Sequence, residues 1–563
     1  MTKSQIKNDD HQPGEEAGDE GSCLKRVKRS IPAEYRDEVL ELCKVAGPVI
    51  IAQSMIFLTG FVSTAFTGHL GKTELASVAL AISVINVTGI SVGTGLSFTC
   101  DTLISQTYGS GNLKQVGVLL QRGVLILLLA CFPCAAILLN TEVLLLLVKQ
   151  SPNVAKLAQI YVNVFLPSLP ASFMYQLQVR YLQNQGIIWP QVFVGAAGNA
   201  VNALMNYILL FPLKFGVAGS AAANAMCQYF MAVFLFIYIY AKGLHKKTWS
   251  GWSLECLQEW GSFIQMAIPS MLMLCLEWWM FELGGFLAGV ISELELATQS
   301  VVYELGVLCY MMPLGFSAAA SLRVGNALGA GKTEQAKLSA KVPIVCGFLI
   351  SCVVGAFMLA IRNYIGYVFT TEQDVLDRLS EVIIVFIVAS IGDGTTGVTG
   401  GVIRGVGKQK VGALCNFLGY YFVGFPIGVS LMFAATLGII GFWTGLCVCV
   451  FLQSTIFITF LCKLNWQQAT VEAQIRAGIP IKDEAEMNKI ASKETEITAA
   501  ESVYAVPDDH QQVQEQSTSP SIIVGHRLST KQLIVRRGLT LFIMLLILCG
   551  GILAQIFLIR LVK

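Results

Sequence analysis

The sequence predicts an all-α polytopic membrane protein, in which two six-helix lobes related by an internal parallel repeat precede a thirteenth, C-terminal transmembrane helix. Composition indicates the class: the 563 residues are 54% hydrophobic and 13% charged, with a mean hydropathy of +0.64, whereas soluble domains carry about 25% charged residues. Apolar windows of about 20 residues, the length of helix that crosses a bilayer, recur along the chain. A repeat between the first six and the next six windows predicts the two lobes.

Twelve apolar windows precede a long polar stretch, and one follows it. We expect the first lobe to use windows 45–66, 76–98, 117–139, 156–177, 188–211 and 216–241. We expect the second lobe to use windows 262–290, 296–320, 342–361, 379–403, 411–433 and 438–462, and the last helix to use 539–559. The predicted units are therefore an N-terminal segment (1–44), the first lobe (45–241), an inter-lobe link (242–261), the second lobe (262–463), a linker (464–537) and the final helix (538–560).

The segments outside the windows are polar. Residues 1–30 hold no apolar stretch that could act as a cleaved signal peptide. The linker contains KDEAEMNK and PDDHQQVQEQSTSPS, runs typical of a disordered, solvated segment. The net charge of +2 gives no reason to expect a nucleic-acid partner. The 16 cysteines lie mainly in apolar windows without zinc spacing, so we expect no metal, cofactor or disulfide.

Basic residues in the short connections predict the orientation in the membrane. With the N-terminus in the cytoplasm, the inner connections of the twelve-helix core hold twelve Lys and Arg: Lys114, Arg180, Lys242, Lys246, Lys247, Arg323, Lys332, Lys337, Lys341, Arg404, Lys408 and Lys410. The outer connections hold six: Lys72, Lys149, Lys156, Lys214, Arg362 and Arg378. This bias predicts a cytoplasmic N-terminus and, after thirteen crossings, an extracellular C-terminus.

An offset of about 221 residues aligns the two halves. It pairs Pro48 with Pro269 and Gly186 with Gly407, aligns SQTYGSGNLKQ with GNALGAGKTEQ after one gap, and aligns GVAGSA at 216 with GIIGFW at 438. The stretch GNALGAGKT, 325–333, is close to a nucleotide-binding P-loop, but Asn326 stands where that pattern requires glycine. We interpret it as one of two equivalent turns after the second helix of each half, and expect no nucleotide. Six helices per half make the repeat parallel, an arrangement of secondary transporters whose sites lie between or within the lobes.

Carboxylates enter the apolar windows of the second half. Glu277 and Glu282 lie in LCLEWWMFELGG, Glu304 lies in VVYELGV and Asp393 lies in ASIGDGTTGV. A charge at the membrane centre costs roughly 2.5–3.5 kcal/mol on insertion scales, so such residues usually face the protein interior or a water-filled cavity. Each acid taken alone has a structural alternative, but four within one half favour a functional role. Glu277 and Glu282 are about 140° apart around a helix, so one can face its own lobe and the other a central cleft.

Aromatic residues accompany these acids. Trp278 lies one helical turn before Glu282, and Tyr303 and Tyr310 share a helix face beside Glu304. Carboxylates with aromatic walls suit an organic cation, through ion pairing and cation–π attraction. Each aromatic residue taken alone is more often a packing residue or an interfacial anchor.

The uncharged Gln53 lies in the first window, where hydrogen bonding between helices and substrate contact are equally good interpretations. Burial of a carboxyl group favours its neutral form, so one group can bind either a proton or an organic cation. This permits antiport without ATP: outside protons neutralise the carboxylates and release the cation, and the protonated protein reopens to the cytoplasm.

Other function classes fit less well. A membrane enzyme would need a nucleophile with its base or a metal cluster, and the sequence contains no H-E-x-x-H, no G-x-S-x-G and no His within the windows. A passive cation channel also uses acidic residues, but it does not need two six-helix lobes.

The sequence resembles the multidrug and toxin extrusion (MATE) transporters from about residue 35 to 465, and most of all their vertebrate branch, which has the additional C-terminal helix. The resemblance rests on GHLGKTELASVAL, CDTLISQTYGSGN, AIPSMLMLCLEWWMFELG, SLRVGNALGAGKTEQA and GGVIRGVGKQKVGA. It implies a V-shaped cavity between two lobes, proton-coupled export of organic cations across the plasma membrane, and no ATP.

By motif, Gln53, Glu277, Glu282 and Glu304 match polar residues critical for transport in the family, and Trp278, Tyr303 and Tyr310 match neighbouring cavity residues. Asp393 stands where vertebrate relatives have a glutamate. No acid lies between residues 45 and 67, so coupling is expected in the second lobe. A related class, flippases of lipid-linked oligosaccharides, would line its cavity with Arg and Lys to hold pyrophosphate, whereas the buried charges predicted here are acidic.

Overall fold

The computed structural model describes residues 32–370, 372–479 and 528–562, and within these residues the chain forms helices and no β-strand. The first group of helices consists of α2 (Ala33–Thr67), α3 (Lys72–Ile85), α4 (Ser91–Ser97), α5 (Thr99–Gly109), α6 (Leu113–Leu138), α7 (Thr141–Leu147), α8 (Pro152–Phe165), α9 (Leu169–Gln183), α10 (Trp189–Leu210) and α11 (Gly216–Ala241). The second group consists of α12 (Trp260–Ile291), α13 (Glu293–Gly329), α14 (Thr333–Ala360), α15 (Arg362–Ile365), α16 (Gln373–Val406), α17 (Gln409–Asn416), α18 (Phe425–Val429) and α19 (Ile439–Lys463). Two helices follow: α20 (Trp466–Arg476) and α22 (Thr530–Val562).

The described part of the chain contains twelve helical segments that are long and apolar enough to cross a membrane. They coincide with every predicted window except 379–403, and that window lies in α16, a helix of 34 residues. Most residues of α16 from Gly392 to Val406 are buried within the protein. The predicted fold class is therefore confirmed.

The internal repeat is visible in the backbone. Three pairs of glycines that the repeat aligns adopt positive φ in both lobes: Gly111 (81°) with Gly331 (75°), Gly186 (77°) with Gly407 (85°), and Gly216 (57°) with Gly438 (62°). Glycine adopts this conformation at little cost. The stretch GNALGAGKT is the last turn of α13, a turn at Gly331 and the start of α14, so it connects two helices, as predicted.

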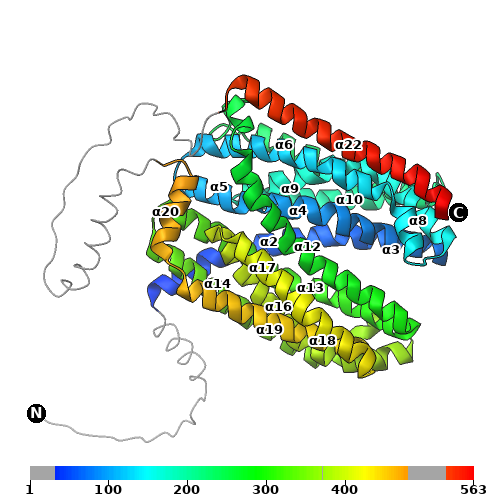
Figure 1. The fold of residues 1–563 in the computed structure, drawn as a ribbon. Coiled ribbons are helices and arrows are strands. Elements are labelled where there is room, and N and C mark those ends of the chain that lie inside the picture. The colour runs from blue at the N-terminus through cyan, green and yellow to red at the C-terminus, as the bar shows by residue number, and fades with distance from the viewer. Residues whose placement is uncertain (1–31, 371, 480–527, 563) are drawn as a thin grey trace, which may run out of the picture.

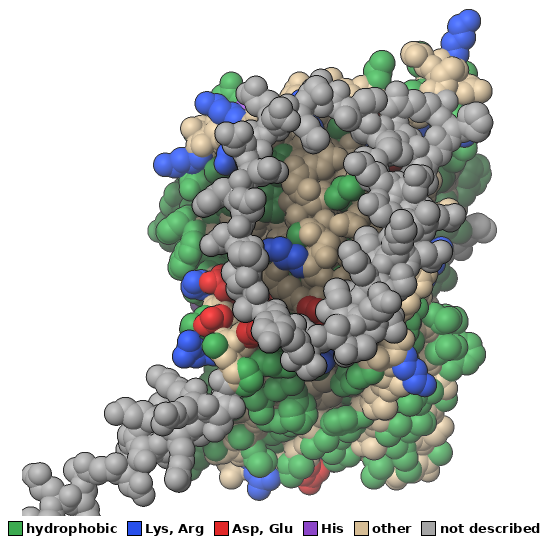
Figure 2. All heavy atoms as spheres, turned by 90° about the vertical axis from the view of Figure 1, so that its left-hand side faces the viewer, with side chains coloured by type: hydrophobic (Ala, Val, Ile, Leu, Met, Phe, Trp, Pro, Cys, Tyr) green, Lys and Arg blue, Asp and Glu red, His purple; other side chains and the backbone are tan. Residues whose placement is uncertain are grey.

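The two lobes meet at one end of the molecule and diverge towards the other (Figure 1). At the meeting end, which we call the closed end, α5 of the first lobe packs against α13, α16 and α20. Nearer the middle, α4 packs against α12, and α2 packs against α13 and α14. Figure 2 looks onto the closed end, where Lys, Arg, Asp and Glu side chains are visible, while apolar side chains cover the flanks.

Both ends of the predicted linker, 464–537, are helical where the structure describes them. Trp466–Arg476 form α20, whose N-cap Asn465 accepts a hydrogen bond from the backbone N–H of Gln468 at 3.1 Å, and α22 already begins at Thr530. Ala469, Ala473 and Ala477 recur every four residues, and each is at most 1% exposed. Because the other positions of α20 are mostly polar, the sequence does not reveal this narrow alanine face, which packs against the closed end. The remaining linker, 480–527, lies outside the described residues.

The count of basic residues in connections also needs correction. Arg180, Arg323 and Arg404 lie within α9, α13 and α16, and Arg378 lies within α16. All four form ion pairs with Asp or Glu side chains. Other counted residues also lie within helix bounds, among them Lys114, Lys337 and Lys341 on the predicted inner side and Lys72 and Lys156 on the predicted outer side. Fewer basic residues therefore lie in connections than expected, on both sides.

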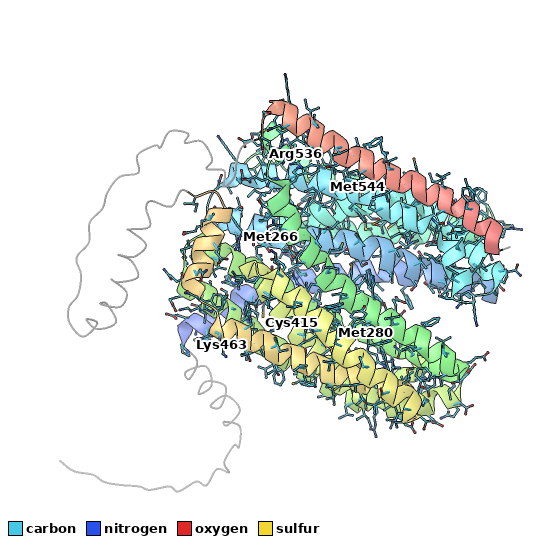
Figure 3. All side chains as sticks on the ribbon, viewed as in Figure 1. Met266, Met280, Cys415, Lys463, Arg536 and Met544 are labelled. Carbon is cyan, nitrogen blue, oxygen red and sulfur yellow. The ribbon has the colours of Figure 1, made fainter. Side chains whose placement is uncertain are left out.

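The last helix, α22, packs along α6 and α7 of the first lobe. Arg536 lies near its closed-end terminus and Met544 lies further along (Figure 3). A Cβ at Gly551 would overlap the backbone of Ala136, and the carbonyl of Gly551 accepts a hydrogen bond from Asn140 Nδ2 at 3.0 Å. The guanidinium of Arg537 lies 4.1 Å from the ring centroid of Trp260. The thirteenth helix is therefore docked on the first lobe.

Candidate functional site

A cavity of about 730 Å³ lies between the lobes, and its walls come from both. All the residues that the sequence singled out line this one cavity: Gln53, Glu277, Trp278, Glu282, Tyr303, Glu304, Tyr310 and Asp393. The four carboxylates come from α12, α13 and α16 of the second lobe, and Gln53 comes from α2 of the first. The second lobe therefore supplies the acidic wall.

Glu277 faces the interior of its own lobe. Its carboxyl group neighbours the Tyr310 hydroxyl on α13, Asp393 on α16 and Arg404 near the end of α16. Tyr420, which is fully buried, faces both acids. This cluster places two carboxyl groups and one guanidinium deep in the cavity wall.

Glu282 faces the other lobe. One of its carboxylate oxygens accepts a hydrogen bond from Ser83 Oγ on α3 at 2.7 Å. The expected division is therefore observed: Glu277 points into its lobe, and Glu282 spans the cleft. The hydroxyl of Tyr303 has Glu282 and Glu304 as its charged neighbours.

Two π-helical turns shape the cavity walls. In the first lobe the turn Asn86–Ile90 joins α3 to α4, and its Val87 carbonyl accepts a hydrogen bond from Trp279 Nε1 across the cleft at 3.1 Å. In the second lobe the turn Phe417–Gly424 lets Tyr421 donate to the carbonyl of Leu276, next to Glu277, at 3.2 Å. Such turns often occur at functional sites, because they rotate the following side chains out of the regular helical register.

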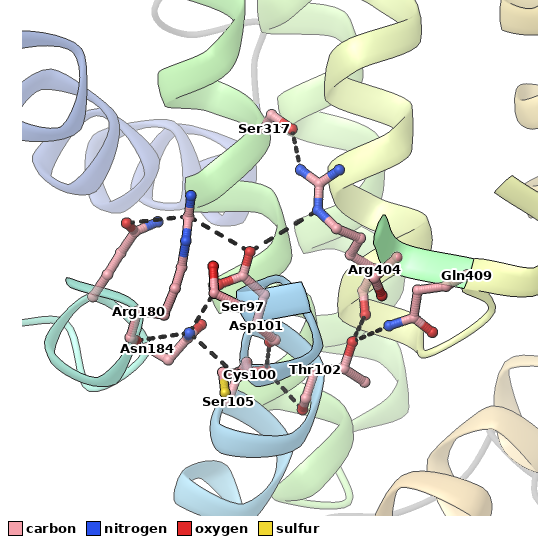
Figure 4. Close-up of polar contacts among 12 residues, drawn as sticks. Ser97, Cys100, Asp101, Thr102, Ser105, Arg180, Asn184, Ser317, Arg404 and Gln409 are labelled. Atoms are coloured by element: carbon pink, nitrogen blue, oxygen red, sulfur yellow. Dashed lines mark hydrogen bonds and ion pairs between the residues drawn. The ribbon is translucent and has the colours of Figure 1, made fainter. Parts of the chain in front are cut away.

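The sequence did not predict a cluster of charged residues where the cavity approaches the closed end (Figure 4). Asp101 of α5 lies 3.6 Å from Arg180 of α9 and 4.0 Å from Arg404 of α16. The two guanidinium carbons lie 4.5 and 4.6 Å from the centroid of the Phe98 ring. Both arginines line the cavity, so its charged residues are not all acidic, although the two share one carboxylate.

These arginines stood close to window ends in the sequence, which suggested loop positions. No local pattern indicates that Asp101 would join residues 79 and 303 positions away. The pairing depends on how the lobes meet.

The arrangement suits recognition of a positively charged, partly apolar molecule. Carboxylates can pair with such a cation, and Trp278, Tyr303 and Tyr310 offer aromatic faces within the same cavity. Among the described residues no group of three or more His, Cys, Asp or Glu side chains is arranged to hold a metal ion.

Two parallel six-helix lobes with a carboxylate-bearing cavity between them define a membrane transporter of the repeat type. The family model of MatE matches residues 48–208 and 269–430, one segment in each lobe. This chain belongs to the MATE family of multidrug and toxin extrusion transporters.

Relatives extend the match to nearly the whole chain. Multidrug and toxin extrusion protein 1 of Danio rerio is 59% identical over 555 residues, which are 96% of this chain and 94% of that protein. The human protein of the same name is 48% identical, with 93% and 94% covered. The crystal structure of the eukaryotic MATE transporter AtDTX14 superposes with a TM-score of 0.76 at 30% identity and covers 79% of this chain and 100% of that one.

Proposed function

We propose that this protein exports small organic cations in exchange for protons by alternating access, without an enzymatic step and without nucleotide or other cofactor. The observation that carries the proposal is the gathering of four carboxylates and three aromatic side chains on one cavity between two lobes. A carboxylate can be neutralised by a proton or by a bound cation, and the two ligands therefore compete. The names of the relatives support a broad range of drug-like and toxic substrates.

Each residue has a proposed role. Glu277 and Asp393 form the proton-exchanging pair, because they lie close together in the second lobe. Glu282 and Glu304 flank Tyr303 and attract the cation at the cleft. Trp278, Tyr310 and Gln53 complete the wall around the bound molecule.

In the proposed cycle the cation binds to ionised carboxylates from the cytoplasm. The cavity then opens to the outside, where protons neutralise the acids and release the cation. The protonated protein reopens to the cytoplasm, and the proton gradient drives the cycle.

The proposed location is the plasma membrane, with the N-terminus and the closed end in the cytoplasm and the C-terminus outside. The start of α2, α20 and the start of α22 are all at the closed end of the molecule, and the C-terminal end of α22 is at the opposite end (Figure 1). This agrees with a cytoplasmic linker between α20 and α22. The proposed units remain the N-terminal segment, the two lobes with their inter-lobe link, the linker and the final helix, with α20 added to the second lobe.

Uptake of labelled tetraethylammonium into proteoliposomes tests the proposal. With the lumen more acidic than the medium, we expect the wild-type protein to concentrate the cation, and Glu277→Gln to lose this concentration. Glu381→Gln is the matched control, because its side chain is 61% exposed and, among the residues that the structure describes, forms an ion pair with Arg378 alone. Uptake that ignores the pH gradient in the wild type would overturn the antiport proposal, and would leave a passive cation channel or a flippase of lipid-linked oligosaccharides to be tested.

A further inference from the structure

The closed end contains two helix crossings that the repeat relates to each other. Gln106 and Gly109 of α5 align with Asn326 and Gly329 of α13. A Cβ at Gly109 would overlap the backbone of Asn326, and a Cβ at Gly329 would overlap the backbone of Gln106. Gly109 of the first lobe thus lies against Asn326 of the second, and Gly329 of the second lobe lies against Gln106 of the first. The two helix ends therefore cross in backbone contact.

Both glycines are needed for space and not for backbone conformation. They are the last residues of α5 and α13, and neither has positive φ. A third contact continues the crossing, since a Cβ at Gly325 would overlap the side chain of Ser105. Any larger residue at these positions would force the two lobes apart at this end.

The same end holds a helix terminus that is capped from outside its own lobe. The last carbonyl groups of an α-helix have no partner within the helix. In α16 the carbonyl of Arg404 accepts a hydrogen bond from Thr102 Oγ1 at 2.5 Å, and that of Gly405 accepts one from Gln106 Nε2 at 2.8 Å. Both donors belong to α5 of the first lobe, so the first lobe helps to cap the C-terminus of α16 while the lobes are together, in addition to the bond that the Gly407 N–H donates to the Arg404 carbonyl at 3.0 Å.

Helix α20 adds to the closure. Arg476 donates to the carbonyl of Val406 at 3.0 Å and to Gln106 Oε1 at 2.9 Å. Asn112, just after α5, donates to the carbonyl of Ala477 at 3.0 Å. The helix is thereby attached to the end of α16 in the second lobe and to α5 and its following turn in the first.

These contacts suit a closure that opens and closes repeatedly. Hydrogen bonds to side-chain amides, hydroxyls and helix carbonyls are replaced by water at little net cost, because both states satisfy the same groups. In the charged cluster next to the crossing, protein side chains and not water would satisfy the separated partners. Asp101 and Arg404 belong to opposite lobes, and each would keep a partner of its own after separation, since Arg180 remains beside Asp101 and Ser317 beside Arg404.

We infer that the paired crossings of Gly109 and Gly329, together with the capping of α16 by Thr102 and Gln106, form the gate that shuts the closed end against the cytoplasm. Arg404 is its positioning residue, holding the end of α16 against α5 through Asp101 and Phe98. The inference rests on the proposed alternating access. It assigns to the glycine-rich stretch at 325–333 a function in closing the transporter.

Thiol labelling of a cysteine placed within the crossing tests the gate. Ser105 is fully buried between the lobes, so Ser105→Cys reports opening when a maleimide reagent reacts with it. The rate is read at residue 105 by mass spectrometry, on the full-length protein in nanodiscs at one pH and without substrate. We expect Gly109→Ala and Gly329→Ala each to raise this rate about tenfold or more, since overpacking strongly penalises the closed state.

Gly47→Ala and Gly285→Ala are the matched controls, because a Cβ at either helical glycine meets nothing within 4 Å. Both controls have the same glycine-to-alanine change in helix propensity as the gate variants. Gln106→Ala removes a cap without adding bulk, and we expect a smaller rise of the same direction. Labelling of all three gate variants at the control rate, with the proteins monodisperse, would overturn the gate. The outcome is independent of coupling: if wild-type uptake ignores pH while labelling rises, the antiport proposal fails and the gate stands.

Discussion

Replacing Glu38 should destabilise the fold strongly, although it lies far from the cavity acids. Glu38 is on α2, yet its carboxylate accepts hydrogen bonds from Arg323 Nε at 2.6 Å, from Arg323 Nη2 at 2.5 Å and from Ser339 Oγ at 2.7 Å. Arg323 and Ser339 belong to α13 and α14 of the second lobe. The Glu38 side chain is 5% exposed and that of Arg323 is 18% exposed, so water screens the pair little.

Removing one partner of a buried ion pair costs about 3–5 kcal/mol. Glu38→Gln keeps the shape and one acceptor oxygen, so we expect a loss near the lower end, about 3 kcal/mol. With an unfolding entropy of about 2.1 cal/mol/K per residue, this corresponds to a fall in melting temperature of roughly 2–3 °C. The assay is thermal unfolding of the detergent-solubilised protein.

Glu41→Gln is the control, because Glu41 lies on the same helix and pairs with Lys44 at 2.6 Å where both side chains are about half exposed or more. Exposed pairs contribute about 0–1 kcal/mol, and the control should shift the melting temperature by less than about 1 °C. Equal melting temperatures for the two variants would refute the reasoning that burial makes the Glu38 pair strong.

Three further predictions follow from individual contacts. Trp278→Ala should raise the KM for tetraethylammonium about 2-fold to 30-fold, the range of one cation–π contact, while Trp278→Phe raises it less; uptake kinetics measure both, and an unchanged KM in Trp278→Ala would exclude the contact. Ser83→Ala removes the cross-lobe hydrogen bond to Glu282 and should lower kcat/KM for the cation several-fold without changing the melting temperature by more than about 1–2 °C, whereas unaltered kcat/KM would show that Glu282 needs no support. Arg537→Ala removes the contact with Trp260 and two hydrogen bonds to the carbonyl of Leu257; it should increase proteolytic cleavage before α22, and cleavage at the wild-type rate would contradict the docking of that helix.

The fold was predictable from the sequence because each helix that spans a membrane needs a long apolar window. The repeat was predictable because glycines such as Gly111 and Gly331 are fixed by turns with positive φ. The cavity acids could be singled out because a carboxylate in an apolar helix has few tolerable surroundings.

Other parts of the site depend on contacts that no local pattern reports. Asp101, Arg180 and Arg404 form one cluster only because α5, α9 and α16 converge. The alanine face of α20 can be recognised only once the helix ends on which it packs are known. The polar residues on either side of it resemble those of a linker. The π-helical turn Asn86–Ile90 inserts a residue into the backbone register, which side-chain periodicity does not reveal.

The central claim is that a proton and an organic cation compete for the same carboxylates in one cavity. Proton release upon binding tests it most directly: tetraethylammonium is added to the purified protein in weakly buffered detergent solution, and a pH-sensitive dye records the change. We predict acidification for the wild type and for Glu381→Gln, and a much smaller signal for Glu277→Gln. Binding of the cation by the wild type without any release of protons would contradict the claim.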